Sequence, residues 1–176
     1  MKRIGILGDI GSGKSYIAQK FDYPVFNADL EVSKIYKKDR NFFNKLKKQL
    51  PKSFSSFPVK KEDVLNAIIS NKNNLNKIVK IIHPLIRKKL NIFLNKNKNK
   101  KIVILDIPLL LENKLDKKND LLIFIQAEKK QILKRLKKRK NYNKFLLKKF
   151  KKIQLPLAYK KRKSSFIIKN DFKSQS

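Results

Sequence analysis

The sequence predicts an α/β fold in which a mainly parallel sheet is flanked by helices. Apolar runs of strand length, such as residues 102–105, recur between segments in which apolar residues follow helical spacing. This alternation is typical of doubly wound α/β proteins. The first apolar run, residues 4–7, stops at a glycine-rich loop that leads directly into a helical segment. A length of 176 residues has room for a single domain of this kind.

The expected elements follow the apolar pattern along the chain. Strands are expected at residues 4–7, 24–26, 102–105, 121–125 and 165–168. Helices are expected at residues 15–21, 29–36, 40–50, 60–69, 75–94, 128–138 and 145–153. Within the fifth of these helices, His83 and Pro84 either open a new helix or kink a long one, because proline has no backbone N–H to donate.

The formal net charge of +33 is the most unusual global property of the chain. A charge of this size attracts polyanions, so nucleic-acid binding is one hypothesis. The alternative is a lysine-rich background spread over solvent-facing positions. We favour the background, because the lysines are scattered through nearly every segment and form no basic stripe interleaved with aromatic residues. We therefore expect no specific nucleic-acid partner.

The chain contains no cysteine, which excludes disulfides and thiolate metal sites. Its N-terminal apolar run is too short for the core of a signal peptide or for a membrane span. These features predict a cytoplasmic protein without a membrane partner. We also expect a monomer.

A complete phosphate-loop pattern, G-x-x-x-x-G-K-S, occupies residues 8–15 between the first expected strand and helix. Glycines let the backbone wrap closely enough for its N–H groups to point at phosphate oxygens, and the start of the helix adds partial positive charge. Lys14 would reach the β- and γ-phosphates of a nucleotide, while the Ser15 hydroxyl would hold Mg²⁺. The pattern predicts ATP binding.

Two aspartates stand at or after the ends of expected strands, where ligands of α/β proteins bind. Asp106 ends the run at residues 102–105, where an acidic residue supports the metal in phosphate-loop enzymes, although such an Asp also often forms a turn. Asp29 could orient and deprotonate a substrate hydroxyl, or it could cap the following helix. The residues alone leave both alternatives open.

Two pairs of cationic or titratable side chains are further candidates. His83, the only histidine, and Arg87 are four residues apart and would share a helical face, which suits anion recognition; a surface or capping histidine is the alternative. Arg135 and Arg139 have the same spacing in a chain whose basic residues are mostly lysine. They could bind phosphate through planar guanidinium groups or form a solvated helix face.

Together the motifs resemble the dephospho-coenzyme A kinase family over nearly the whole chain. Residues 8–15 look like its phosphate loop, 27–29 like its Asp-Ala-Asp segment, 82–87 like its His-Pro-x-x-Arg segment and 105–113 like its Asp-x-Pro-Leu-Leu-x-Glu block. In the C-terminal third, the family's spacings are matched by Arg135, Arg139, Gln154, Lys160 and Asn170. Phosphate loops occur in many unrelated enzymes, so the 105–113 block and this ordered series discriminate best.

The resemblance implies a phosphate-loop kinase architecture with a nucleotide-binding core at about residues 1–28, 101–134 and 161–171. It also implies a helical substrate-binding insertion at about residues 29–95 and a helical lid at about residues 135–160. The implied reaction transfers the γ-phosphoryl group of ATP, with Mg²⁺, to the ribose 3′-hydroxyl of dephospho-coenzyme A, the last step of coenzyme A synthesis.

The resemblance also assigns roles to residues of this sequence. The implied catalytic residues are Lys14, Asp29 and Arg139. The implied ATP contacts are Gly11, Ser12, Gly13, Lys14, Ser15, Tyr16, Arg135, Arg139 and Asn170. The implied contacts to the substrate are Asp29, His83, Arg87, Gln154 and Lys160, and the implied metal contacts are Ser15 and Asp106.

Three positions depart from the family's pattern. Asn27 replaces the first Asp of the Asp-Ala-Asp segment and removes one possible metal-binding carboxylate, while Asp29 is kept. Asp9 stands where Gly is usual, and it should cost phosphate affinity unless its side chain points away. Asp171 follows Asn170 where a small residue is common.

Two other functions remain as alternatives. Another small-molecule or nucleotide kinase would share the loop and lid but need a different acceptor pocket, against which Asp29, His83 and Arg87 argue. A basic nucleic-acid-binding ATPase is favoured by the charge of +33 and disfavoured by the lack of an added binding domain.

Overall fold

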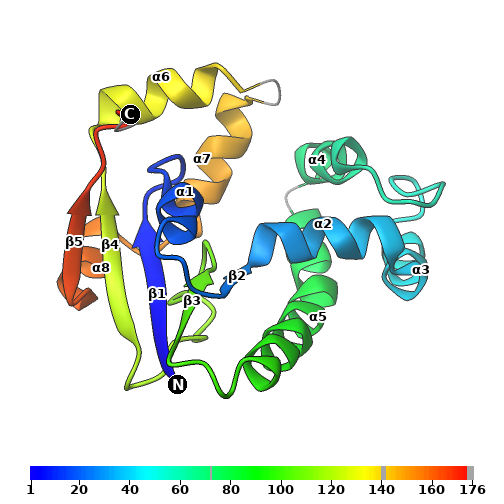
Figure 1. Ribbon diagram of the computed structural model, residues 1–176. Coiled ribbons are helices and arrows are strands. Elements are labelled where there is room, and N and C mark those ends of the chain that lie inside the picture. Colours follow the sequence, from blue (N-terminus) through cyan, green and yellow to red (C-terminus); the bar gives the residue numbers. More distant parts are fainter. Residues whose placement is uncertain (72, 140–141, 174–176) are drawn as a thin grey trace. The chain divides into compact units, whose positions relative to one another are not determined.

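The computed structural model describes residues 1–71, 73–139 and 142–173. The chain divides into two compact units, each of which is described separately below. The sheet unit consists of Met1–Asn27 and Lys96–Ser176, and the helical unit consists of Ala28–Asn95. Figure 1 shows the strands and helices with their labels.

The sheet unit is built on five parallel strands in the order β2-β3-β1-β4-β5. The strands are β1 (Lys2–Gly8), β2 (Val25–Asn27), β3 (Ile102–Asp106), β4 (Leu121–Gln126) and β5 (Phe166–Lys169). The central strands β1, β3 and β4 are almost wholly buried, as expected for a parallel sheet that is covered on both faces. The predicted α/β class with a parallel sheet and flanking helices is confirmed.

Among the described residues of the sheet unit there are four helices, α1 (Lys14–Gln19), α6 (Lys129–Lys137), α7 (Lys144–Lys152) and α8 (Leu157–Lys163). Figure 1 shows α1 in front of the sheet and α8 behind it. Ala18 of α1 packs into an apolar cluster with alternate residues of the central strands, namely Ile4, Ile6, Ile104, Ile123 and Ile125. Because successive strand side chains point to opposite faces of the sheet, these isoleucines share one apolar face, and α1 packs on it.

The short helix α8 was not predicted from the sequence. Its seven residues contain only Leu157, Ala158 and Tyr159 as apolar members, which is too few for a helical period to be visible. Tertiary contacts stabilise it instead, because α8 packs against β1 and β4. Its central residue Lys160 is 1% exposed, the lowest value for any charged residue that the structure describes.

The helical unit contains α2 (Ala28–Lys38), α3 (Arg40–Gln49), α4 (Lys61–Ser70) and α5 (Asn74–Lys96). The buried side chains of α5 recur every four residues, at Ile78, Ile82, Ile86 and Leu90. This stripe is the face that an amphipathic helix turns toward a core. Because α5 continues through Pro84, the alternative in which His83 and Pro84 open a new helix is wrong.

A buried ion pair joins distant segments of the sheet unit. The Nζ atom of Lys160 lies 2.6 Å from Oε1 of Glu112, and both side chains are almost fully buried. The same carboxylate oxygen accepts a hydrogen bond from the backbone N–H of Leu155 at 2.9 Å. Glu112 therefore holds both α8 and the connection between α7 and α8 against the segment that follows β3.

This geometry predicts that Lys160→Met destabilises the protein by about 3–5 kcal/mol, because the substitution leaves a buried carboxylate without its cation. Urea unfolding followed by circular dichroism measures the effect. The matched control is Lys161→Met, since Lys161 is exposed on the same helix and should change stability by less than about 0.5 kcal/mol. The pair Glu112→Gln with Lys160→Met should recover part of the loss; equal stability of the two single lysine variants would contradict the prediction.

Candidate active site

The phosphate loop connects β1 to α1 and requires glycine at three positions. Gly8, Gly11 and Gly13 have φ values of 148°, 85° and 92°, and side chains are strained in this left-handed region. A Cβ atom at Gly8 would lie 2.7 Å from the backbone oxygen of Ile125, and one at Gly11 would lie 3.0 Å from Leu136. The loop is therefore pressed closely against β4 and α6.

Lys14 lies inside this loop. Its buried Nζ atom donates hydrogen bonds to the backbone oxygens of Asp9 at 2.7 Å and Gly8 at 3.2 Å. Nearby, the Ser12 side chain is fully buried, and its hydroxyl has no hydrogen-bond partner among the residues that the structure describes. The glycine backbone N–H groups, the Lys14 ammonium and the Ser12 hydroxyl are together a set of hydrogen-bond donors that fits phosphate oxygens.

The carboxylate of Asp9 has two donors of its own. The backbone N–H of Ile10 donates to Oδ1 at 2.7 Å, and Nζ of Lys151 on α7 lies 3.2 Å from Oδ2. This cation offsets the charge that was expected to oppose phosphate binding. Sequence reasoning missed Lys151, since nothing distinguishes it from the many other lysines of the chain.

Asn170 ties the segment after β5 to the phosphate loop. Its Nδ2 atom donates to the backbone oxygen of Ser12 at 2.9 Å, and its backbone N–H donates to the oxygen of Gln126 at 2.8 Å. Next to it is a hollow of about 340 Å³, lined by Gln126, Ala127, Glu128, Gln131, Lys169, Asn170 and Asp171. The predicted Asn170 thus borders both the loop and the hollow beside it.

The two candidate arginines lie at different places. Arg135 is on α6, and its guanidinium carbon lies 4.4 Å from the centre of the Phe172 ring. Arg139 follows the end of α6 at Lys137, so the expectation that both arginines share one helical face is wrong. After Lys137 the chain forms a tight turn, in which the N–H of Arg139 donates a hydrogen bond to the backbone oxygen of Leu136. Arg139 therefore lies outside the α-helix.

Asp106 ends β3 as predicted, next to the end of β2. It is buried, and its Oδ2 atom accepts a hydrogen bond from Nδ2 of Asn27 at 2.6 Å. Asn27, one of the departures from the family's pattern, therefore orients the Asp106 carboxylate. Within residues 1–71, 73–139 and 142–173, no group of three or more His, Cys, Asp or Glu residues could hold a metal ion. Mg²⁺ commonly uses one or two protein ligands and completes its shell with phosphates and waters, which fits Ser15 and Asp106.

Asp29 lies in the first turn of α2, exposed and one residue past the start of the helix. This position is inside the helix and weakens the capping alternative. The charge of Asp29 reaches Tyr36 on the same helix: burial and then the Asp29 carboxylate raise the pKa of the Tyr36 hydroxyl to about 12. The Asp29 carboxylate is therefore accessible to solvent, and its charge helps to keep the Tyr36 hydroxyl protonated.

His83 and Arg87 lie four residues apart on α5. Burial of the imidazole and, secondarily, the positive charge of Arg87 lower the pKa of His83 below its ordinary value. A neutral imidazole beside a guanidinium offers both a hydrogen-bonding nitrogen and a fixed cation.

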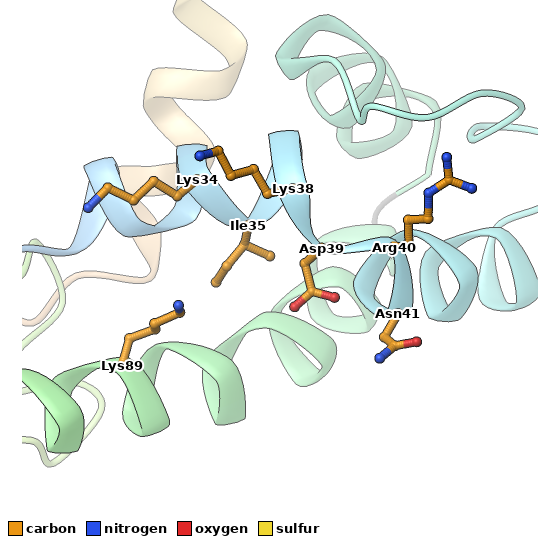
Figure 2. A pocket seen from close by; sticks show the side chains of 7 residues that line it. All are labelled: Lys34, Ile35, Lys38, Asp39, Arg40, Asn41 and Lys89. Atoms are coloured by element: carbon orange, nitrogen blue, oxygen red, sulfur yellow. The ribbon is translucent and has the colours of Figure 1, made fainter.

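A second hollow, of about 470 Å³, lies within the helical unit. Figure 2 shows the side chains that line it: Lys34, Ile35, Lys38, Asp39, Arg40, Asn41 and Lys89. Four of them are cationic, and the one carboxylate, on Asp39, already accepts a hydrogen bond from the N–H of Phe42 at 2.9 Å. The hollow suits anions. None of its residues was predicted, because basic clusters are common throughout this chain.

Among the described residues, no helix has the length and apolar character needed to cross a membrane. The remaining predicted contacts, Tyr16 on α1 and Gln154 just after α7, both lie in the sheet unit.

Comparison with known proteins places the chain among kinases. The family model described as Dephospho-CoA kinase matches residues 2–176. A dephospho-CoA kinase from Wolbachia sp. subsp. Brugia malayi is 33% identical over 170 residues, which cover 94% of this chain and 87% of the relative. A crystal structure from Thermus thermophilus aligns with a TM-score of 0.74 at 22% identity over 96% of this chain and 88% of its own. A dephospho-CoA kinase structure from Campylobacter jejuni aligns with a TM-score of 0.61 at 24% identity, over 98% of this chain and 89% of its own. Both structures support the fold.

The environment of His83 predicts that the stability of the protein depends on pH. Because the folded-state pKa lies below the ordinary 6.5, the unfolded chain takes up the proton first, and the free energy of unfolding should fall as the pH drops below about 6.5. His83→Gln should remove this contribution. As the only histidine, His83 can be titrated by proton NMR without assignment. Arg87→Gln should raise its pKa; a wild-type pKa at or above 6.5 would refute the argument.

Proposed function

Because the chain belongs to the dephospho-CoA kinase family, we propose that it transfers the γ-phosphoryl group of ATP to the ribose 3′-hydroxyl of dephospho-CoA. The observation that carries the proposal is the match of the family model to residues 2–176. The constricted loop around Lys14 supports it. Transfer of this kind depends mostly on positioning and on neutralising charge.

On the nucleotide side, the phosphates would lie along residues 11–16, with backbone N–H groups as donors. Lys14 would exchange its carbonyl partners, on Gly8 and Asp9, for oxygens of the β- and γ-phosphates, since a charged acceptor makes the stronger hydrogen bond. Arg139 would approach the transferring group from the end of α6, where its guanidinium is exposed. These cations would stabilise the charge that spreads over the phosphoryl oxygens in the transition state.

Ser15 and Asp106 would hold Mg²⁺ in this proposal. The ion would neutralise charge between the β- and γ-phosphates. The hydrogen bond from Asn27 keeps the Asp106 carboxylate at the end of β3, so a ligand at this position would need no rearrangement of the strand.

On the acceptor side, Asp29 would orient the 3′-hydroxyl and take its proton, while His83, Arg87 and Gln154 would bind the rest of the substrate. Lys160 is buried against Glu112, so we assign it a positioning role. It stabilises the carboxylate that also accepts the N–H of Leu155, the neighbour of Gln154. In this way Lys160 would fix Gln154 without touching the substrate itself.

The proposal extends to the setting of the enzyme. It would work as a cytoplasmic monomer, and the charge of +33 would raise the local concentration of anionic substrates without a specific nucleic-acid partner.

An acceptor competition assay tests the proposed function. ADP release is measured with dephospho-CoA, adenosine, shikimate and nucleoside monophosphates, and we expect dephospho-CoA to have the highest kcat/KM. Lys14→Ala should abolish transfer while circular dichroism stays unchanged. Preference for another acceptor would favour the alternative small-molecule kinase, and stimulation of ATP hydrolysis by polynucleotides would favour the nucleic-acid-binding ATPase.

Asp29→Asn separates a catalytic role from a helical one. Asparagine caps helices about as well as aspartate but cannot take a proton. We expect turnover to fall by roughly 10²- to 10⁴-fold, with little change in melting temperature and near-normal ATP affinity. If Asp29→Asn turns over normally while Asp29→Ala loses stability, Asp29 is a structural residue, and Asp106 becomes the next candidate base.

A further inference from the structure

We propose that α7 sets the affinity of the phosphate loop for phosphates through the ion pair between Lys151 and Asp9. The proposal rests on the nucleotide half of the proposed function, and it makes Lys151 a positioning residue that acts through Asp9 without contacting the ligand. Nζ of Lys151 lies 3.2 Å from Oδ2 of Asp9. The pair joins the last turn of α7 to the loop across 142 residues of sequence.

Asp9 places an acidic side chain inside the phosphate loop. Its backbone oxygen accepts hydrogen bonds from Nζ of Lys14 at 2.7 Å and from the N–H of Ser12 at 3.2 Å. Its carboxylate is folded back on the loop, because Oδ1 accepts the N–H of Ile10 at 2.7 Å, and its side chain is 10% exposed. A buried negative charge at this place repels the phosphates that the loop would bind, and burial reduces the screening of that repulsion by water and salt.

Lys151 offsets this repulsion while its ammonium stays at the loop. The Lys151 side chain is 47% exposed, so the attraction of the Asp9 carboxylate and the position of the α7 backbone keep it there. That backbone is held at two places. Leu146 of α7 is buried, and beyond the C-terminal end of the helix the N–H of Leu155 donates to Oε1 of Glu112 at 2.9 Å. The position of the cation therefore follows the position of α7.

The ion pair thus couples α7 to phosphate binding. With the pair formed, the charge of Asp9 is compensated, and the phosphates meet Lys14 and the backbone N–H groups of the loop. With Lys151 away from the loop, the carboxylate opposes them. Because coupling between two sites is reciprocal, bound phosphates in turn favour the arrangement in which α7 lies against the loop. An acid can stand in this loop, against the family's pattern, because a residue far along the chain compensates it.

A double-mutant cycle on Asp9 and Lys151 measures the coupling. Calorimetry on the full chain without acceptor gives the affinities for inorganic tripolyphosphate and for ATP. Lys151→Met keeps an aliphatic side chain but removes the charge, so it should weaken both ligands by about 5- to 20-fold, because an uncompensated carboxylate then lies beside them. Lys151→Arg restores the cation and should restore most of the affinity.

Asp9→Asn removes the acid and keeps an oxygen that can accept the N–H of Ile10. It should leave the binding of both ligands within about 3-fold of the wild type, because the acid and the cation that it holds are lost together. In the Asp9→Asn background, Lys151→Met should change the affinities by less than about 2-fold.

The matched control is Lys152→Met, since Lys152 is exposed in the same last turn of α7 and its substitution removes the same charge from the chain. It should change neither affinity by more than about 2-fold. Adenosine, which has no phosphates, separates an effect of charge from an effect of shape, and it should bind the wild type and Lys151→Met equally well.

Three results would overturn the coupling. An equal loss from Lys151→Met with and without Asp9→Asn would mean that Lys151 contacts the phosphates directly. Equal weakening of adenosine would mean that the variant distorts the site, and unchanged tripolyphosphate binding would mean that the pair has no influence on the loop. If the wild type binds neither ATP nor tripolyphosphate, the nucleotide half of the proposed function fails together with the coupling. An error in the proposed acceptor alone leaves all of these measurements unchanged.

Discussion

The candidate site depends on the backbone of the phosphate loop, which has no room for a side chain at its three glycines. At Gly8, Gly11 and Gly13 the phosphate loop adopts left-handed conformations, and neighbouring atoms occupy the space of a Cβ at each position. The neighbours come from β4, α6 and the segment after β5, so three separate parts of the sheet unit converge on one loop. Replacing any of these glycines would both strain the backbone and push these elements apart.

Electrostatic pairing in the sheet unit is a consequence of the unusual composition. The chain has 46 lysines and arginines but only 13 acidic residues, and several of the buried acids serve structural contacts. Glu112 pairs with Lys160, Asp9 with Lys151 and Asp120 with Arg3. Each pair joins segments far apart in sequence. The excess of positive charge therefore remains on the surface, where it attracts anions without defining a specific partner.

Much of the candidate site could be predicted because its motifs are local. The phosphate loop is continuous in sequence, and its glycine spacing carries the chemistry directly. Asp106 and Asn170 stand at strand ends, where a parallel sheet gathers ligand-binding residues. Lys151 could not be found in this way. Its role arises from a contact with Asp9, which lies 142 residues away in the sequence.

The sequence by itself determined the class of the fold, the phosphate loop and the family, because apolar periodicity and short motifs are properties of neighbouring residues. Only the tertiary structure decided that seven residues around Lys160 form a helix, since the helix depends on burial against the sheet and on Glu112. The same holds for Asn27. In the sequence, Asn27 stands out only because it replaces a carboxylate of the family's pattern. In the fold, the parallel pairing of β2 with β3 places Nδ2 of Asn27 2.6 Å from Oδ2 of Asp106. In both cases the structure differs from the sequence-based expectation because the deciding contacts join distant segments, which local sequence patterns do not encode.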